Sequence, residues 1–582
     1  MLTALLLLCP EWVAAASSPK TYRNPVIPGF HPDPSCTLVS EWDNTFFCAT
    51  SSFNAFPGVP VFASKDLINF RQIGNVIDRS TQLPGLGKIN GSTSGIWAPS
   101  IRYHEGTFYV VTTLVYDNLA QNDSSRWDNI IFKTQNPFSD QWSDPVHFTF
   151  EGYDTSPFWD VDGKTYVQGS HAWRVQPGIQ GFEIDLDTGK MGSIFGLWNG
   201  TGGIAPEAPH IFHQDGFYYL MIAEGGTGLG HMVTMARSKS INGPFEADPL
   251  NPVLTNANTS AYFQTVGHAD LFQDTAGNWW SVALSTRSGP DFIYYPMGRE
   301  TVLTSVTWKA GEFPTFTPVS GQESGPLPPT NKNIPGTGVW AGTPTEQLTF
   351  APRSTLPSNF VHNRFPDPHA FRISPSGHPN TLQLLPSVLN LTGLDGRSAA
   401  TPQTFVGRRQ EHVEFTMEVS LNFEPKQDQE EAGVTVFLNQ AQHFDLGVVA
   451  LSRDSATQAG FTGTPSNPSG LSKYIRLRTI TQFSSNMGAE DLISKPGLLP
   501  LANHDLNGIQ LQIEAVNNTW YAFRYRTGAT PEWTTVGWGS SNEVSGGFTG
   551  TILGMFATGN GQEGNDAAYF SDFTYSGNPN VF

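Results

Sequence analysis

A short pattern of apolar strand, polar turn and second apolar strand occurs five times in the first half of the chain. A repeat of this size built from antiparallel strands is typical of a β-propeller blade. The sequence therefore predicts an all-β unit of five blades over residues 22–318. Spaced by 62, 57, 53 and 61 residues, the turns are centred on Asn44, Gly106, Gly163, Gly216 and Gly277.

Residues at a shared offset from these turns have side chains suited to catalysis or to substrate binding. Equivalent positions in radially arranged blades point to the mouth of the central channel, so we expect their side chains to converge and interpret the convergence as an active site. Nine residues before the four glycines, and eleven before the asparagine, stand Trp97, Asp154, Glu207, His268 and Asp33.

Three converging carboxylates cannot all stay ionised, so their pKa values must separate. One then serves as a base and another as an acid, as cleavage of a glycosidic bond requires. Asp33 lies between prolines and suits the base, whereas Glu207 has apolar neighbours that favour the acid. Each residue also has a plainer interpretation: a turn aspartate, a core tryptophan, a hydrogen-bonded histidine. The shared offset is what favours a site.

Length, charge and composition limit the class of protein. A chain of 582 residues exceeds what one core usually serves and predicts two domains. The formal net charge of −19 argues against nucleic acid and anionic membranes as partners, because both attract basic faces. A neutral substrate fits this charge.

The amino terminus resembles a secretory signal over residues 1–18, with an apolar run followed by small residues, although no Lys or Arg precedes the run. No later apolar stretch is long enough to span a bilayer. We therefore expect a secreted, extracellular protein. Sequons that fit a glycoprotein begin at Asn90, Asn122, Asn199, Asn258, Asn390 and Asn517.

Two cysteines, Cys36 and Cys48, lie symmetrically about residue 42 in the first predicted hairpin. They can face each other across two antiparallel strands, either as a disulfide in an oxidising compartment or as two buried thiols. The sequence leaves both alternatives open. Neither cysteine has the neighbours of a zinc site.

After the repeats, residues 319–344 are rich in Pro, Gly and polar residues and read as a linker. From residue 345 to 582 the pattern changes to strict alternation of apolar and polar residues. Many such strands separated by turns predict a β-sandwich or jelly roll. In one strand the apolar face consists of Val413, Phe415, Met417, Val419, Leu421 and Phe423.

Six ordered segments of the propeller region resemble glycoside hydrolase family 43: YRNPVIPGFHPDPS, GIWAPSIRYHEGTFYVV, GYDTSPFWDVDGKTYV, APEAPHIFHQDGFYYL, TVGHADLF and YPMGRETVL. The resemblance implies a five-bladed propeller and an inverting hydrolase. The carboxyl-terminal half resembles the concanavalin-like sandwich of the β-xylosidase branch, which packs on the propeller and shapes the cleft.

Carried over by motif, the resemblance implies Asp33 as general base, Asp154 as the residue that tunes and orients the acid, and Glu207 as general acid. It places His268 at the channel centre, beside either a calcium ion or a water, and no other cofactor is expected. Ala208 replaces the glycine that follows the acid in many relatives, a change expected to alter pocket shape. The implied substrate contacts are Trp97, His268, Arg299 and Phe30.

The motifs look most like fungal enzymes that remove α-L-arabinofuranosyl side chains from arabinoxylan. We expect that polysaccharide or its oligosaccharides as partner, and a monomer. A β-D-xylosidase or a bifunctional xylosidase/arabinofuranosidase is the alternative, because the two pentoses present their reacting centres similarly. A non-catalytic carbohydrate-binding protein is a third interpretation, which the converging acids disfavour.

Overall fold

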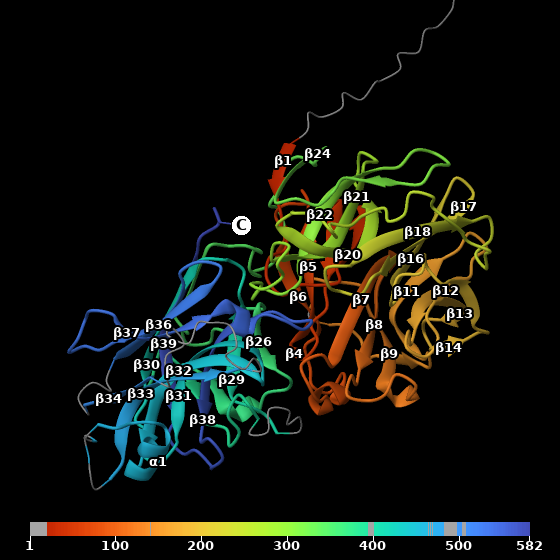
Figure 1. Cartoon of the computed structure of the whole chain (residues 1–582). Helices are drawn as coiled ribbons and strands as arrows, with labels where there is room; N and C mark the ends of the chain where they lie inside the picture. The colour runs from red at the N-terminus through yellow and green to blue at the C-terminus, as the bar shows by residue number, and fades with distance from the viewer. Residues whose placement is uncertain are drawn as a thin grey trace, which may run out of the picture.

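The structure is a computed structural model that describes residues 20–139, 141–393, 401–463, 465, 467, 470–481, 497–502 and 508–581. The predicted signal segment, residues 1–18, lies outside the described residues. Two all-β units lie side by side, the propeller followed by the sandwich (Figure 1). The predicted fold class is confirmed.

Five antiparallel sheets form the blades, and each comes from one continuous stretch of chain. Blade 1 consists of β2 (Ser35–Val39), β3 (Thr45–Ala49), β5 (Gly58–Ser64) and β6 (Arg71–Ile77). Blade 2 consists of β7 (Gly95–His104), β8 (Thr107–Val115), β9 (Trp127–Thr134) and β10 (Val146–Phe148). Blade 3 consists of β11 (Gly152–Trp159), β12 (Thr165–His171), β13 (Ile179–Asp185), β14 (Lys190–Met191) and β15 (Phe195–Trp198).

Blade 4 consists of β16 (Glu207–Gln214), β17 (Phe217–Glu224), β18 (Met232–Ser238) and β19 (Glu246–Ala247). Blade 5 consists of β20 (Phe263–Gln273), β21 (Trp279–Arg287), β22 (Glu300–Thr307) and β23 (Thr315–Phe316). The five predicted turns each join the first two strands of a blade. All five turn residues have a left-handed backbone, with φ between 53° and 82° at Asn44, Gly106, Gly163, Gly216 and Gly277.

The segment before blade 1 closes the ring by binding to blade 5. Strand β1 (Lys20–Arg23) pairs with β24 (Gln322–Gly325), and Val26 N–H donates to the carbonyl of Thr301 in β22 at 3.0 Å. In blade 1, Cys36 and Cys48 are opposite each other in the β2–β3 register and form a disulfide. Of the two alternatives left open by the sequence, the structure contains the disulfide.

The sandwich contains two sheets whose facing sides form one apolar core. The predicted apolar face of residues 413–423 is buried there. One sheet runs in the order β34 (Gly497–Leu501), β33 (Ser472–Ile480), β32 (Gln442–Leu451), β31 (Glu431–Asn439), β38 (Ile552–Thr558), β29 (Phe405–Arg409), β26 (Phe360–Asn363) and β4 (Ala55–Phe56). The other runs β27 (Phe371–Ile373), β28 (Leu382–Leu384), β39 (Ala568–Gly577), β30 (Phe415–Asn422), β35 (Ile509–Ala515), β36 (Trp520–Arg526) and β37 (Thr534–Ser540), with β25 (Thr345–Leu348) beside β39.

The two units share a sheet edge, because β4 belongs to the chain of blade 1 but pairs with β26 of the sandwich. A second junction joins the segment before β22 to the sandwich loop before β38. There, Thr551 N–H donates to the carbonyl of Pro296 at 2.8 Å, and Tyr295 N–H donates to Ser545 Oγ at 2.9 Å. These bonds hold the sandwich loop against blade 5.

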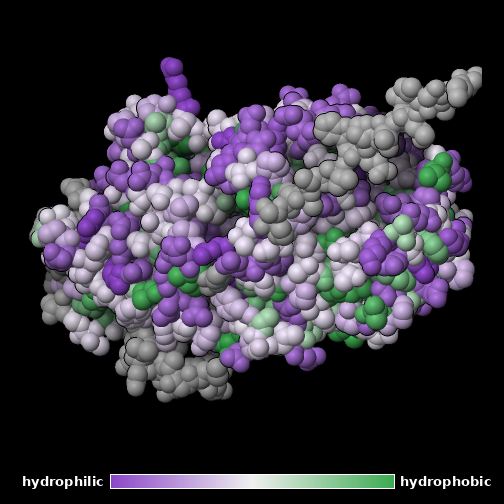
Figure 2. All heavy atoms as spheres, turned by 90° about the horizontal axis from the view of Figure 1, so that it is seen from above, coloured by the Kyte–Doolittle hydropathy of each residue, from purple (hydrophilic) through white to green (hydrophobic). Residues whose placement is uncertain are grey.

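Within the described residues, the α-helical structure consists of α1 (Arg453–Gln458), and no helix there is long and apolar enough to cross a membrane. The face shown in Figure 2 is predominantly hydrophilic, with apolar residues in small separate patches. Short 3₁₀ turns occur at Ser40–Trp42, Pro84–Lys88, Ser124–Arg126, Pro368–Ala370 and Ser541–Val544.

Candidate active site

A cavity at the mouth of the propeller brings together all five residues that share the repeat offset. Each comes from the first strand of a different blade: Asp33 just before it, Trp97, Asp154 and Glu207 near its start, and His268 near its middle. The wall is completed by Phe53, Ala98, Tyr153 and Thr227 of the propeller and by Phe548 of the sandwich. The residues predicted from sequence that line this cavity are Asp33, Trp97, Asp154, Glu207, His268 and Arg299.

The backbone at these positions departs from regular strand. Strands β7, β11, β16 and β20 each have a shift in register near their starts. Such irregularities bend a strand and change the direction of its side chains. Non-glycine residues there adopt a left-handed backbone, which is uncommon and marks local constraint. The φ values are 55° at Asp33, 52° at Asp154, 54° at Ala208 and 49° at His268.

The carboxyl group of Asp33 is buried and fully paired. Arg299 Nη1 donates to Oδ1 at 2.8 Å, and Ser51 Oγ donates to Oδ2 at 2.5 Å. Burial by itself raises the pKa of an aspartate, but here the charges of Arg299 and His268 and the Ser51 hydrogen bond lower the pKa of Asp33 below its usual value. Asp33 is therefore ionised at neutral pH, as a general base must be.

Glu207, the first residue of β16, has the opposite electrostatic environment. Its side chain is 15% exposed, and its nearest donor, Tyr153 Oη, is 3.3 Å from Oε2. Burial, followed by the negative charge of Asp33, raises the pKa of Glu207 to about 7. A carboxyl that keeps its proton near neutral pH can act as a general acid.

Asp154 lies between the other two acids and receives one backbone hydrogen bond. The N–H of Ala208 donates to Asp154 Oδ2 at 3.1 Å, which ties Asp154 to the residue after Glu207. Burial and the charges of Glu207 and Asp33 raise the pKa of Asp154 well above its usual value. Ala208 makes this contact from a left-handed backbone, a conformation that a glycine would adopt with less strain.

His268 lines the cavity beside two of the acids. Its Nδ1 is 3.6 Å from Asp33 Oδ1 and 3.9 Å from Asp154 Oδ2. Burial lowers the pKa of His268, although the charge of Asp33 opposes this effect. Near it, Arg102 forms two hydrogen bonds with Asp270, at 2.7 and 2.9 Å, in an ion pair whose aspartate is fully buried and whose arginine is 19% exposed.

Arg299 connects three parts of the molecule. Its Nη1 contacts both Asp33 and Thr227 Oγ1, the latter at 3.2 Å, and its Nε donates to the carbonyl of Phe548 at 3.1 Å. The guanidinium carbon lies 5.5 Å from the ring centroid of Phe53 and 5.3 Å from that of Phe548. In this structure Arg299 holds the base; its predicted contact with a substrate hydroxyl remains a prediction.

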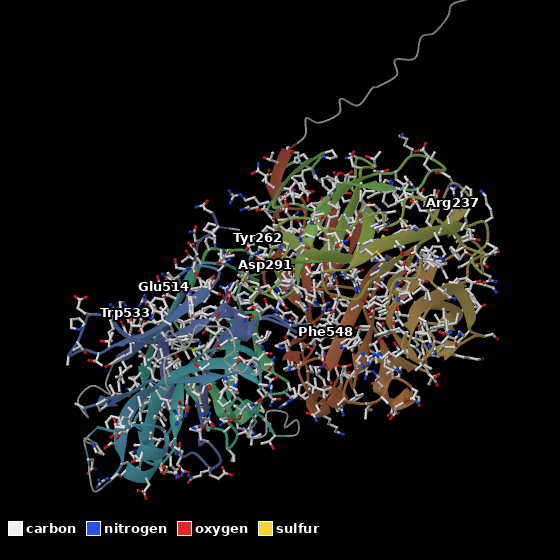
Figure 3. The ribbon with its side chains drawn as sticks, in the orientation of Figure 1. Arg237, Tyr262, Asp291, Glu514, Trp533 and Phe548 are labelled. Carbon is white, nitrogen blue, oxygen red and sulfur yellow. A yellow bond between two sulfur atoms is a disulfide. The ribbon has the colours of Figure 1, made fainter. Side chains whose placement is uncertain are left out.

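Aromatic rings form the wall of the cavity. Trp97, whose Nε1 donates to the carbonyl of Thr93, packs edge-to-face on Tyr153 and on Phe548 at centroid distances of 5.5 and 5.9 Å. Phe548 is half-buried in the sandwich loop and reaches the propeller mouth at the junction of the two units (Figure 3). The cavity therefore requires both domains.

Phe30 does not reach the cavity surface. Its side chain is 1% exposed, and it packs behind Phe53 with the Arg409 guanidinium 5.4 Å from its ring centroid. The short segment before Asp33 turns Phe30 toward the sandwich, so Phe53 takes the position on the wall.

Sequence reasoning missed five residues of the wall, of which Ala98 directly follows Trp97. Tyr153 immediately precedes Asp154, and Thr227 lies in a glycine-rich segment, so both could have been found beside recognised motifs. Phe53 and Phe548 have no local signal. Phe548 is 515 positions from Asp33 in sequence, and only the packing of the sandwich brings it to the site.

The inner cavity opens into a cleft of about 860 Å³ between the loops of blades 2, 3 and 4. Glu207 stands at the boundary between the cleft and the cavity, which share Trp97, Tyr153, Glu207, Thr227 and Phe548. The outer part of the cleft is lined by both polar and apolar side chains, namely Asp117, Arg126, Trp173, Arg174, Val175 and Ile204.

The calcium that the family resemblance leaves open does not fit the residues around His268. Calcium takes six to eight oxygen ligands, whereas the acids nearest His268 are Asp33, which is paired with Arg299, and Asp154. In the parts of the chain that the structure describes, no group of three or more His, Cys, Asp or Glu side chains could hold a metal ion.

Comparison with known proteins gives matches over nearly the whole chain. The family model described as "Glycosyl hydrolases family 43" matches residues 22–314, and that described as "Beta xylosidase C-terminal Concanavalin A-like domain" matches residues 349–464 and 474–576. A non-reducing end alpha-L-arabinofuranosidase of Bacteroides ovatus is 33% identical over 98% of each chain. A xylosidase/arabinosidase of Butyrivibrio fibrisolvens is 32% identical over 95% of this chain and 98% of that relative.

The solved structure of Bacteroides ovatus Xyloglucan PUL GH43B has a TM-score of 0.78 with this chain. It is 32% identical, and the match covers 96% of this chain and 100% of that chain. The similarity thus extends across the propeller and the sandwich together.

Replacing Glu207 should separate substrates by leaving group. We expect Glu207→Ala to lower kcat about 10²–10⁴-fold on substrates whose leaving group needs a proton, and far less on activated aryl glycosides. In the unmodified protein kcat/KM should fall as the pH rises through about 7, where Glu207 loses its proton. This fall, the basic limb of the pH profile, should be absent from the Glu207→Ala variant. Glu246→Ala, an exposed residue of the same blade, is the control. Equal losses on both substrate classes would contradict the acid role.

Removing the Phe548 ring should open the cavity wall. We expect Phe548→Ala to lower kcat/KM on the order of tenfold, because an aromatic pair contributes about 0.5–1.5 kcal/mol beyond its buried area and Phe548 contacts two rings. Trp533→Ala, at the far end of the sandwich (Figure 3), should leave kcat/KM unchanged. Steady-state kinetics on an oligosaccharide makes the comparison, and an unaltered Phe548→Ala enzyme would show that the sandwich takes no part in the site.

Proposed function

Because the chain belongs to glycosyl hydrolase family 43, we propose that it is an inverting exo-α-L-arabinofuranosidase that removes arabinose side chains from arabinoxylan. That it is a glycoside hydrolase follows from the family and from relatives named as arabinofuranosidases and xylosidases. The non-catalytic interpretation is therefore discarded. The linkage, the polymer and the stereochemistry form the proposal.

The observation that carries an exo mode of action is the closed end of the cavity. Past Asp154 and His268 the space narrows to about 10 Å³ and is bounded by His210, which contacts Arg102 of the Arg102–Asp270 ion pair at 3.1 Å. The wide cleft of about 860 Å³ opens instead at Glu207. A blind cavity accepts one terminal sugar, and the cleft accommodates the chain that carries it. A side chain of one pentose on a xylan backbone has this shape.

The protonation states support a division of roles. Asp33, whose pKa is lowered, would draw a proton from the attacking water, while Glu207, whose pKa is raised to about 7, would protonate the leaving oxygen. Asp154 would position the acid through the Ala208 N–H. Inversion requires room for the water, so we expect the carboxyls of Asp33 and Glu207 to lie roughly 6.5–9.5 Å apart.

Support for arabinofuranose comes from the Bacteroides ovatus relative, which matches over 98% of each chain. A β-D-xylosidase, alone or combined with arabinofuranosidase activity, is the second candidate. It is favoured by the Butyrivibrio fibrisolvens relative, named for both activities and also matched along its whole length. The two candidates use the same acids and differ in which pentose the aromatic wall accepts.

The substrate assay is a comparison of 4-nitrophenyl α-L-arabinofuranoside with the β-D-xylopyranoside. We expect a higher kcat/KM on the arabinofuranoside, and release of arabinose alone from arabinoxylan. Proton NMR of the first product should show the inverted anomer. A higher kcat/KM on the xyloside would replace the first candidate by the second, and a retained anomer would refute the assigned role of Asp33.

We further propose that the protein is secreted, with residues 1–18 removed as its signal. The Cys36–Cys48 disulfide supports an oxidising compartment. Expression of the full chain in a secreting host, followed by amino-terminal sequencing of the protein in the medium, should give a terminus near residue 19. A protein that stays inside the cells with Met1 intact would refute this.

A further inference from the structure

His231, just before β18, is a buried histidine beside the proposed acid that the mechanism above does not use. Its side chain is fully buried. Its Nδ1 lies 2.9 Å from the carbonyl oxygen of Thr265. A carbonyl oxygen only accepts hydrogen bonds, so Nδ1 must carry the proton. In a neutral ring, Nε2 then has a free lone pair.

The ring is neutral because burial lowers the pKa of His231 to about 3, an effect that the charges of His268 and Arg299 reinforce. The Nε2 atom is buried and has no hydrogen-bond partner among the described residues. It points toward Glu207, with 3.9 Å between Nε2 and Oε1. A buried acceptor without a partner is costly, so it indicates a donor that the resting geometry nearly supplies.

The surroundings fix the position of this ring. A Cβ atom at Gly267 would lie 2.5 Å from three atoms of the imidazole, so the ring lies flat on the glycine backbone. The backbone is held as well, because His231 N–H donates to the carbonyl of Gly228 and Thr255 Oγ1 donates to the carbonyl of His231. The lone pair therefore cannot turn away from Glu207.

We propose that His231 is a positioning residue that holds the proton of the acid, with neutral Nε2 accepting from Glu207 Oε1–H once the Glu207 side chain turns toward it. A lone pair attracts the protonated carboxyl and repels the carboxylate, so this contact favours the acid form. A small rotation of the Glu207 side chain closes the distance to a hydrogen bond, as commonly occurs between resting and substrate-bound sites.

Other groups also act on Glu207, and their effects must be separated from that of His231. Tyr153 donates to Oε2 and favours the carboxylate, Arg299 does so by charge, and Asp33 opposes both. Among the described residues, none of these groups forms a hydrogen bond with Oε1. The titratable and charged groups facing the pair are Asp33, Tyr153, Asp154, His268 and Arg299.

His231→Phe tests the proposal because it keeps a flat ring and removes the lone pair. We expect the basic limb of kcat/KM to move to lower pH by about one unit, which corresponds to a rate about tenfold lower on the alkaline side and nearly unchanged on the acid side. The position of the limb does not depend on how much enzyme folds. A limb at the original pH, with the rate lowered evenly, would overturn the proposal.

His362→Phe is the matched control. His362 is half-buried, its Nδ1 lies 2.8 Å from the carbonyl oxygen of Phe405, and desolvation lowers its pKa to about 4, but it is in the sandwich. We expect the basic limb of the kcat/KM–pH profile of His362→Phe to stay at the pH of the unmodified protein. A shift equal to that of His231→Phe would show a general effect of losing a histidine ring and would overturn the proposal.

A double substitution isolates the interaction between His231 and Glu207. On an activated aryl glycoside, adding His231→Phe to Glu207→Gln should change the rate less than about twofold, because the amide introduced by Glu207→Gln carries no titrating proton. A loss as large as in the unmodified background would assign His231 a structural role and overturn the proposal. The inference rests on Glu207 as the acid, and the leaving-group test of Glu207→Ala checks that premise independently.

Discussion

The buried ion pair between Arg299 and Asp33 is the interaction on which the site depends. An unpaired carboxylate at this depth would take up a proton, and a protonated Asp33 could not act as a base. The same guanidinium binds Thr227 of the glycine-rich loop and the carbonyl of Phe548. One cation therefore keeps the base ionised and joins blade 1, the loop before β18 and the sandwich.

Asp154, Glu207 and His268 line the cavity with Asp33 because their strands are irregular near these residues. A regular strand directs alternate side chains to opposite faces of its sheet and would not aim the first residues of four blades at one point. The shifts in register and the left-handed residues Asp154, Ala208 and His268 redirect the chain at the mouth. Strained backbone held by surrounding structure is characteristic of functional sites.

Electrostatic asymmetry follows from this packing. Asp33 receives a cation and a hydroxyl, while Glu207 receives one hydroxyl and faces an imidazole lone pair. The pKa of Asp33 is therefore lowered, whereas burial and the charge of Asp33 raise that of Glu207. Two acids of the same chemical class can then hold different protonation states at one pH, the condition for concerted acid and base catalysis.

The sequence by itself determined the five blades, the sandwich and the convergence of Asp33, Trp97, Asp154, Glu207 and His268. These depend on local periodicity and on turns such as Gly106 and Gly216, whose positive φ suits glycine, so short segments carry the information. The tertiary structure alone decided that Phe53 rather than Phe30 lines the cavity, that Phe548 completes it, and that His231 faces Glu207. Phe548 is hundreds of positions from the residues that it contacts, so its place depends on how whole units pack. Phe53 and His231 belong to the same blades as Asp33 and Glu207, but the paths of the loops that carry them are not encoded by any local pattern in the sequence.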